Sequence, residues 1–240
     1  MGKILNKRLK KLKEDVFKSN IELVKKNLVI FTFGNASGID RESGIVAIKP
    51  SGVDYDKLSP ENIVLVDLEG NTLDSNLNPS SDTKTHIMLY IAFPDIGGIV
   101  HTHSKFATSW AQAKKSLLCL GTTHADYFYG EIPCTEVIKD EKIARDYEEE
   151  TGRLIIETFK NKNLDYRHMK ACLVASHGPF TWGKDSGEAV FISAILEEIA
   201  QMNLFTTFIT PNIQNINKTL LDKHYSRKHG KDAYYGQHNP

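Results

Sequence analysis

The sequence predicts an α/β fold in which helices pack around a central sheet that is mixed or mostly antiparallel. Two observations indicate this class. Segments with helical periodicity intermix with short β-branched runs, and the two kinds of segment lack the regular spacing of βαβ units. The chain contains no internal repeat and no low-complexity or linker-like tract. We therefore expect residues 1–240 to form a single domain.

The first part of the chain is expected to form a helix followed by three strands. Leucines recur at helical spacing within residues 4–26, with lysines and arginines between them, which predicts an amphipathic helix with a solvated basic face. The alternative, a targeting peptide, is disfavoured by two acidic residues in the same stretch. β-Branched runs at residues 28–33, 44–48 and 63–67 are separated by Gly, Pro and Ser turns and predict neighbouring strands.

The remainder of the chain alternates helices with two strands that carry histidines. Ser80-Ser81-Asp82-Thr83 precedes an apolar pattern that stops at Pro94, which predicts a capped helix. Gly152 is a candidate interruption in one of the later helices. The further expected elements are a strand at 97–101, a helix at 106–114, a helix at 140–160, a strand at 172–176 and a helix at 186–208.

Composition excludes several classes of partner and location. Thirty basic and thirty acidic residues cancel, so no overall charge attracts the chain to nucleic acid or to an anionic membrane. No apolar run approaches the length of a membrane span, and no stretch resembles a signal peptide. Three cysteines at unrelated spacings suit a reducing compartment. We expect a cytoplasmic protein without a nucleic-acid or membrane partner.

Three histidines at strand ends are candidate metal ligands. His101 and His103 follow the apolar run Gly97-Gly98-Ile99-Val100, and His177 follows a similar run. Side chains two residues apart on a strand point to the same face, so the first two imidazoles are expected to converge. Three imidazoles without a cysteine cluster predict a zinc-like site with one coordination position open for substrate. The alternative is that one or more of them is a hydrogen-bonded strand residue.

Three turns rich in glycine and serine are candidate phosphate-binding segments. They are residues 34–38, 49–52 and 79–82. Glycine lets backbone amides approach a ligand, hydroxyls add hydrogen bonds, and a helix start offers free N–H groups. Ordinary turn chemistry is the alternative for each of them. None matches a P-loop or a dinucleotide fingerprint, so we expect no nucleotide cofactor.

Two carboxylates are candidates for chemistry near such a site. Asp82 is interpreted as a metal ligand or a base, the alternative being a partner of the helix dipole. Asp126 lies outside any run of charges, and we interpret it as a proton-transfer group rather than a turn-forming aspartate. The C-terminal tail contains Tyr234 and Tyr235, which indicate that the tail docks, with another subunit as one candidate surface.

Several ordered stretches of the sequence together carry a family resemblance. They are residues 48–55, 79–83, 97–104, 121–130, 176–180 and 220–225. In this order they resemble the L-ribulose-5-phosphate 4-epimerases of the class II aldolase superfamily. The resemblance runs nearly end to end, although the opening basic helix matches less clearly.

The resemblance implies a three-layer α/β/α protomer, a cyclic homotetramer with active sites at subunit interfaces, and a phosphorylated ketopentose substrate. It further implies that His101, His103 and His177 bind one divalent metal ion per subunit, usually zinc, with manganese or cobalt as alternatives. Asp82 would be a nearby fourth ligand. The proton-transfer residues match Asp126 and Tyr235, of which Tyr235 would reach a neighbouring subunit's site. Substrate contacts would fall on Gly34, Asn35, Lys49, Ser51, Gly52, Ser80 and Ser81.

The implied reaction interconverts L-ribulose 5-phosphate and D-xylulose 5-phosphate. Carbon 4 carries no activated C–H bond, so cleavage and re-formation of the C3–C4 bond is the easier route. One alternative is a class II aldolase that releases its aldehyde, of the fuculose- or rhamnulose-phosphate type. Asp82, where such aldolases often carry a longer glutamate, favours the epimerase. A non-catalytic binding module with the same fold is a second alternative. The sequence does not select among arabinose, ascorbate and other pentose pathways.

Overall fold

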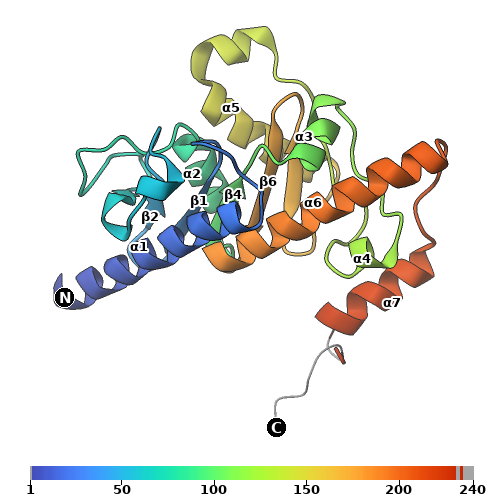
Figure 1. Cartoon of the computed structure of the whole chain (residues 1–240), viewed down its shortest axis with the longest axis horizontal. Coiled ribbons are helices and arrows are strands. Elements are labelled where there is room, and N and C mark those ends of the chain that lie inside the picture. Colours follow the sequence, from blue (N-terminus) through green and yellow to red (C-terminus); the bar gives the residue numbers. More distant parts are fainter. Residues whose placement is uncertain (1, 231–232, 235–240) are drawn as a thin grey trace.

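A six-stranded antiparallel sheet lies at the centre of the computed structural model, which describes residues 2–230 and 233–234 (Figure 1). Its order is β3-β2-β1-β4-β6-β5, and each neighbouring pair of these strands is antiparallel. The predicted α/β class with a mostly antiparallel sheet is therefore confirmed. The strands are β1 (Asn35–Asp40), β2 (Ile45–Ile48), β3 (Val64–Val66), β4 (Gly98–His101), β5 (Ala171–Val174) and β6 (Gly178–Gly183).

Helices cover both faces of this sheet. α1 and the first half of α6 lie on one face, and α2 and α5 lie on the other (Figure 1). The α-helices of the described residues are α1 (Gly2–Lys25), α2 (Thr83–Ala92), α3 (Lys105–Gln112), α4 (Thr122–Ala125), α5 (Asp140–Asn161), α6 (Ser186–Ile209) and α7 (Lys218–His229). Two short 3-10 helices, η1 (Tyr55–Lys57) and η2 (Pro60–Asn62), precede β3.

Alternation along the strands divides the core into two clusters. Ala36 and Val100 belong to the cluster beneath α1, whereas Ile99, one residue before Val100, belongs to the cluster beneath α2. Because successive strand residues face opposite sides, His101 points to the same side as Ile99. The site therefore forms on the face that carries α2 and α5.

One predicted strand is wrong. Residues 28–33 form no strand: Leu28 and Val29 are buried, but Phe31 is 75% exposed. The strand is β1, which begins at Asn35 in the segment that we interpreted as a turn. A Cβ at Gly38 would lie 3.0 Å from Val16 of α1. Small residues in β1 therefore let α1 pack closely on the sheet. Because this close packing needs small side chains, β1 lacks the β-branched residues by which strands are usually predicted.

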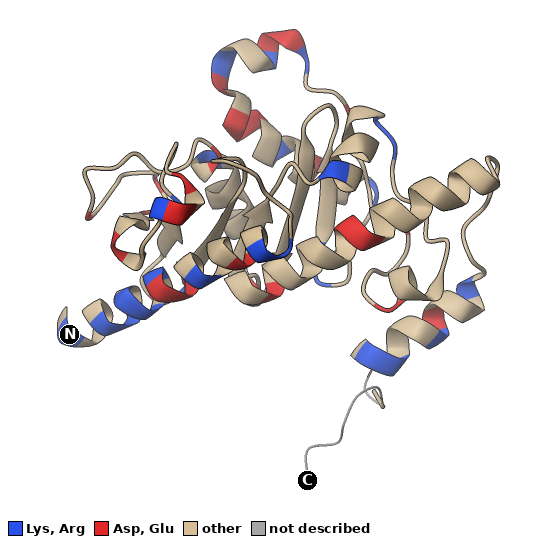
Figure 2. Cartoon of the chain, viewed as in Figure 1, with Lys and Arg blue, Asp and Glu red and all other residues tan. Residues whose placement is uncertain are grey.

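Among the remaining α-helices and strands, some match the ranges predicted from the sequence and three were not predicted. The helix at 140–160 is present as α5, but its interruption lies at Asp146, with φ −154° and ψ 89°, and not at Gly152. β6, α4 and α7 were not predicted. The basic residues expected on the first helix cluster at the start of α1 (Figure 2).

The expectation that no segment approaches a membrane span is wrong for α6. By length and composition this helix could cross a membrane, and 44% of its apolar 18-residue stretch is buried within the fold. It packs against β4, β6 and α1, so a place in the core accounts for the apolar residues of its inner face. The length and composition of α6 are by themselves weak evidence for a membrane helix.

Candidate active site

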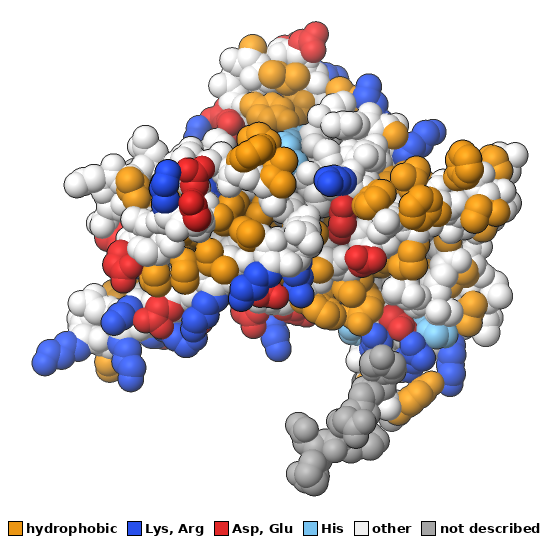
Figure 3. All heavy atoms as spheres, viewed as in Figure 1, with side chains coloured by type: hydrophobic (Ala, Val, Ile, Leu, Met, Phe, Trp, Pro, Cys, Tyr) orange, Lys and Arg blue, Asp and Glu red, His pale blue; other side chains and the backbone are white. Residues whose placement is uncertain are grey.

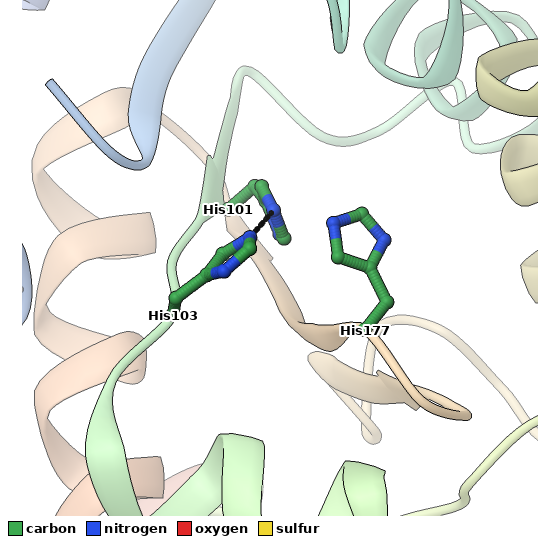
Figure 4. Close-up of side chains that lie close together, drawn as sticks. All are labelled: His101, His103 and His177. Atoms are coloured by element: carbon green, nitrogen blue, oxygen red, sulfur yellow. Dashed lines mark hydrogen bonds between the residues drawn. The ribbon is translucent and has the colours of Figure 1, made fainter.

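Three histidines meet at the ends of two neighbouring strands. His101 is the last residue of β4, and His103 follows two residues later. His177 lies in the turn between β5 and β6, where Ser176 adopts a left-handed φ of 63°. The register of β4 against β6 pairs His101 with Phe180, which brings this turn beside the end of β4. One ring nitrogen of each histidine lies within 4.8 Å of the others (Figure 4).

Hydrogen bonds on the outer ring nitrogens orient two of the three rings. The Nδ1 atom of His101 lies 3.0 Å from the carbonyl oxygen of Pro179. The Nδ1 atom of His177 lies 3.1 Å from the hydroxyl of Tyr147. Both rings therefore keep Nε2 for the space between them, and the Nε2 atoms of His101 and His103 are 3.1 Å apart. Figure 4 shows the three rings turned toward one common centre.

The surroundings lower the pKa of two imidazoles of this cluster, His177 and His103. Burial lowers the pKa of His177, and the neighbouring His101 and His103 lower it further. Burial and His101 also lower the pKa of His103. A histidine must be neutral to bind a metal ion. The convergent donor set, with lowered pKa values at His103 and His177, therefore fits a divalent cation such as zinc.

A half-buried glutamate of α6 fixes the segment that follows His103. Glu197 accepts hydrogen bonds from the hydroxyl of Ser104 at 2.7 Å and from the amides of Phe106 and Ala107 at 2.8 and 2.9 Å. These donors lie at the start of α3, where backbone N–H groups lack intrahelical partners. A side chain from a distant helix thus caps α3 directly after the histidine pair.

Asp82 lies beside the three histidines but outside their group. It precedes α2, yet its carboxylate does not cap the helix; it accepts a 2.7 Å hydrogen bond from the side-chain amide of Asn35. Burial acts to raise the pKa of Asp82, but His101, His86, His177 and Asn35 outweigh it and lower that pKa. The structure therefore places an ionised carboxylate near the imidazoles.

A single pocket of about 420 Å³ contains the predicted metal-binding and substrate-binding residues. Pro50, from the predicted turn at 49–52, also lines it. Tyr147 and Glu148 of α5 line it too, together with Thr32 and Phe33, and the sequence did not indicate any of these four. The predicted residues along its wall are Gly34, Asn35, Lys49, Ser51, Gly52, Ser80, Ser81, Asp82, His101, His103 and His177.

Lys49 places a buried positive charge at this pocket. Its side chain is 2% exposed, and its ammonium group lies 3.3 and 3.4 Å from the carbonyl oxygens of Thr32 and Pro50. Among the described residues no carboxylate forms an ion pair with it. Burial lowers the pKa of Lys49, an effect that Asp54 partly opposes. Such an unneutralised cation suits an anionic ligand.

The structure does not bring Asp126 into this pocket. Asp126 follows α4, and Arg227 of α7 donates to both of its carboxylate oxygens, at 2.9 and 2.6 Å. His224 donates to the same carboxylate at 3.0 Å, and Lys228 lies 3.6 Å away. Burial acts to raise the pKa of Asp126, but these partners lower it. Figure 2 shows basic residues toward the end of α7.

Tyr235, the second predicted proton-transfer residue, lies outside the described residues. Tyr234 before it is 54% exposed, and its amide donates to the carbonyl of Arg227. α7 itself could have been recognised, because Asn217 caps its first turn at Leu220 and basic residues occupy its last turn.

Comparison with known proteins assigns this architecture. Residues 14–204 match the family described as the Class II Aldolase and Adducin N-terminal domain. An L-fuculose 1-phosphate aldolase is similar in structure, with a TM-score of 0.76 and 22% identity over 90% of this chain and 95% of that chain. The L-fuculose 1-phosphate aldolase of Glaciozyma antarctica PI12 has a TM-score of 0.74 and 18% identity over 94% and 84%.

A sugar-phosphate aldolase from Thermotoga maritima is also similar, with a TM-score of 0.65 and 20% identity over 86% of this chain and 99% of that chain. At these identities the structures share the fold, whereas the family match covers most of the sequence. The chain therefore belongs to the class II aldolase and adducin family.

Proposed function

We propose that the protein is a metal-dependent epimerase that interconverts L-ribulose 5-phosphate and D-xylulose 5-phosphate. The observation that carries this proposal is one pocket that holds three converging imidazoles together with a buried lysine and serine-rich turns. The first set suits a metal ion and the second suits a phosphate, which is the combination that a sugar phosphate requires. We further propose that residues 1–240 form one domain of a cytoplasmic protein.

The phosphate end of the substrate is assigned to the lysine and the two serine-rich turns. Lys49 supplies the charge, and Ser51, Ser80 and Ser81 supply hydroxyl donors. Gly52 has a φ of 68° with nothing within 4 Å of a Cβ position, so its backbone is open to a ligand. These contacts would keep glycolaldehyde phosphate in the pocket after the C3–C4 bond breaks, so that its other face can be presented.

The ketone end is assigned to the histidine cluster. A divalent cation there, zinc with manganese or cobalt as alternatives, would act as a Lewis acid toward the negative charge that develops on the substrate oxygens. His101, His103 and His177 would hold it, with Asp82 beside them. The side-chain oxygen of Asn35 is buried and has no hydrogen-bond partner within residues 2–230 and 233–234, so it is available to accept a hydrogen bond from a substrate hydroxyl.

Proton transfer at the 4-hydroxyl is assigned to Asp126 and Tyr235. Because Asp126 lies outside the pocket of its own chain, we propose that it acts in the pocket of a neighbouring copy. The donating surface around α4 and α7 differs from the receiving surface around the pocket, so the contact is head to tail, and we propose that it closes into a ring. A homotetramer with active sites at subunit interfaces satisfies this requirement.

Exposed apolar side chains support such an interface. Phe205, Phe208 and Ile209 at the end of α6 are 54, 87 and 78% exposed, and hydrophobic atoms gather on this part of the surface (Figure 3). Phe31 and Phe33 are exposed near the pocket. Exposed apolar patches of this kind mark contacts with other proteins.

An aldolase that releases its aldehyde is the second candidate, favoured by the names of the similar structures. Asp82 supports the epimerase instead, because a glutamate would reach one methylene further toward the histidines. Conversion of L-ribulose 5-phosphate to D-xylulose 5-phosphate, repeated after chelation and metal add-back, tests the proposal. Condensation of dihydroxyacetone phosphate with an aldehyde, without epimerisation, would identify the aldolase.

A further inference from the structure

The kink in α5 places a tyrosine against one of the candidate metal ligands. At Asp146 the backbone leaves the helical conformation, and the helix resumes over residues 147–161. The carboxylate of Asp146 accepts a 3.2 Å hydrogen bond from the amide of Glu149, which is the bond of an N-cap. Tyr147 is therefore the first residue of the resumed segment.

Contacts with α2 hold this restart in place. Lys84 forms an ion pair with Asp146, and the hydroxyl of Thr85 donates to the carbonyl of Glu148 at 2.6 Å. Gly152 packs against α2 so closely that a Cβ there would lie 2.9 Å from the Cβ of Met88. The position of Tyr147 is thus set by the helix that begins beside Asp82.

The hydrogen bond between Tyr147 and His177 selects one ring nitrogen. When Nε2 of His177 binds a cation, the ring proton must be on Nδ1, so the tyrosine oxygen is the acceptor. The carbonyl of Pro179 accepts from Nδ1 of His101 in the same way. No described residue forms a hydrogen bond with Nδ1 of His103, and its other nitrogen faces His101.

We propose that Tyr147 is a positioning residue, which fixes the ring orientation of His177 and accepts its Nδ1 proton when Nε2 binds the metal. The inference rests on the metal site of the proposed function, but it does not depend on the substrate. Partners of this kind orient metal-binding histidines in other proteins, and their loss costs about 10- to 100-fold in metal affinity. Tyr147 differs from Pro179 in being a side chain, so it can be changed by mutation.

The test is a titration of metal-free protein with Zn²⁺ against a competing chelator, together with the visible absorption spectrum of the Co²⁺ form. Tyr147→Phe is expected to weaken Zn²⁺ binding about 10- to 100-fold and to alter the Co²⁺ spectrum. Tyr166→Phe is the matched control, because it removes a 2.7 Å hydroxyl bond to Asp95 that is remote from the histidines. It should change neither measurement.

Two further variants make the outcome decisive. Lys84→Met keeps the tyrosine side chain but removes the ion pair that holds Asp146 beside it. A loss of Zn²⁺ affinity smaller than that of Tyr147→Phe supports the positioning role. His177→Ala tests the metal site itself. If His177→Ala lowers affinity and Tyr147→Phe does not, this inference is overturned while the site stands. If His177→Ala also leaves Zn²⁺ binding intact, the proposed metal site fails. A loss of kcat in Tyr147→Phe at unchanged metal affinity overturns the positioning role.

Discussion

The histidine pocket and the Asp126 cluster differ in how their polar groups are satisfied. The histidines lie at or beside strand ends, and His101 and His177 have a backbone carbonyl and a tyrosine hydroxyl as partners for their outer nitrogens. Asp126 lies between two helices and is surrounded by cationic side chains of α7. A preformed cluster of converging imidazoles can take up a cation directly. A carboxylate that is held ionised by ion pairs must instead meet its substrate through the surface that α4 and α7 present.

The largest effect is expected from the histidine pocket. His177→Ala or His101→Ala should remove the bound metal ion and lower turnover by more than about 10³-fold, because electrostatic stabilisation of the developing charge is lost. Metal analysis and the epimerase assay check this. His168→Ala, a change at an exposed histidine, should preserve both. Stoichiometric metal and full activity in His177→Ala would refute the site.

The next largest effect is expected from variants of the proposed proton-transfer residues, Asp126 and Tyr235. Asp126→Asn should reduce turnover by about 10²- to 10⁴-fold without changing metal content, because it removes an acid/base group and leaves the imidazoles untouched. Tyr235→Phe should behave alike. Steady-state kinetics and metal analysis on the same preparations separate the two regions. Normal turnover by either variant would remove that residue from the mechanism.

Mixing the two kinds of variant tests whether the regions meet between subunits. His177→Ala and Asp126→Asn, unfolded together and refolded, should recover about a quarter of the wild-type activity, because that fraction of head-to-tail contacts joins two intact halves. Each variant refolded alone is the control. An inactive mixture of correctly assembled oligomers would show that each site is completed within one chain.

The smallest effect is on stability in acid. Burial lowers the pKa of His124 in α4 to about 4, whereas its ordinary value is 6.5. As the pH falls from about 6.5 to 4, the unfolded chain takes up a proton that the folded chain refuses. The free energy of unfolding should therefore fall by up to about 1.4 kcal/mol per pH unit from this group. In His124→Asn the slope, measured by denaturant titration of metal-free protein, should become shallower. An unchanged slope would contradict the assignment.

The sequence was informative where one residue pattern had one structural outcome. Strand alternation predicted that His101 and His103 face the same side, and the second apolar run placed His177 at another strand end. It was uninformative where packing overrode local preference. The middle of β1 consists of the small residues Ala36, Ser37 and Gly38, and α1 lies against Gly38, so the segment had the composition of a turn.

The pocket also depends on contacts that no local pattern encodes. Tyr147 and Glu148 line it because Asp146 interrupts α5, and that interruption is stabilised by Lys84 from a different helix. The separation of Asp126 from the pocket could not be predicted either, because it depends on where α4 and α7 pack. Motif similarity assigned roles to residues without indicating which of them share a pocket within one chain.

The cap that Glu197 provides makes the His-x-His strand a poor module for transplantation. A fragment that ends before residue 186 would retain both imidazoles of the pair, yet the first turn of α3 would have three donors exposed to water. Engineers who wish to build this metal cluster into another scaffold must therefore import an acidic side chain from a remote helix along with the strand.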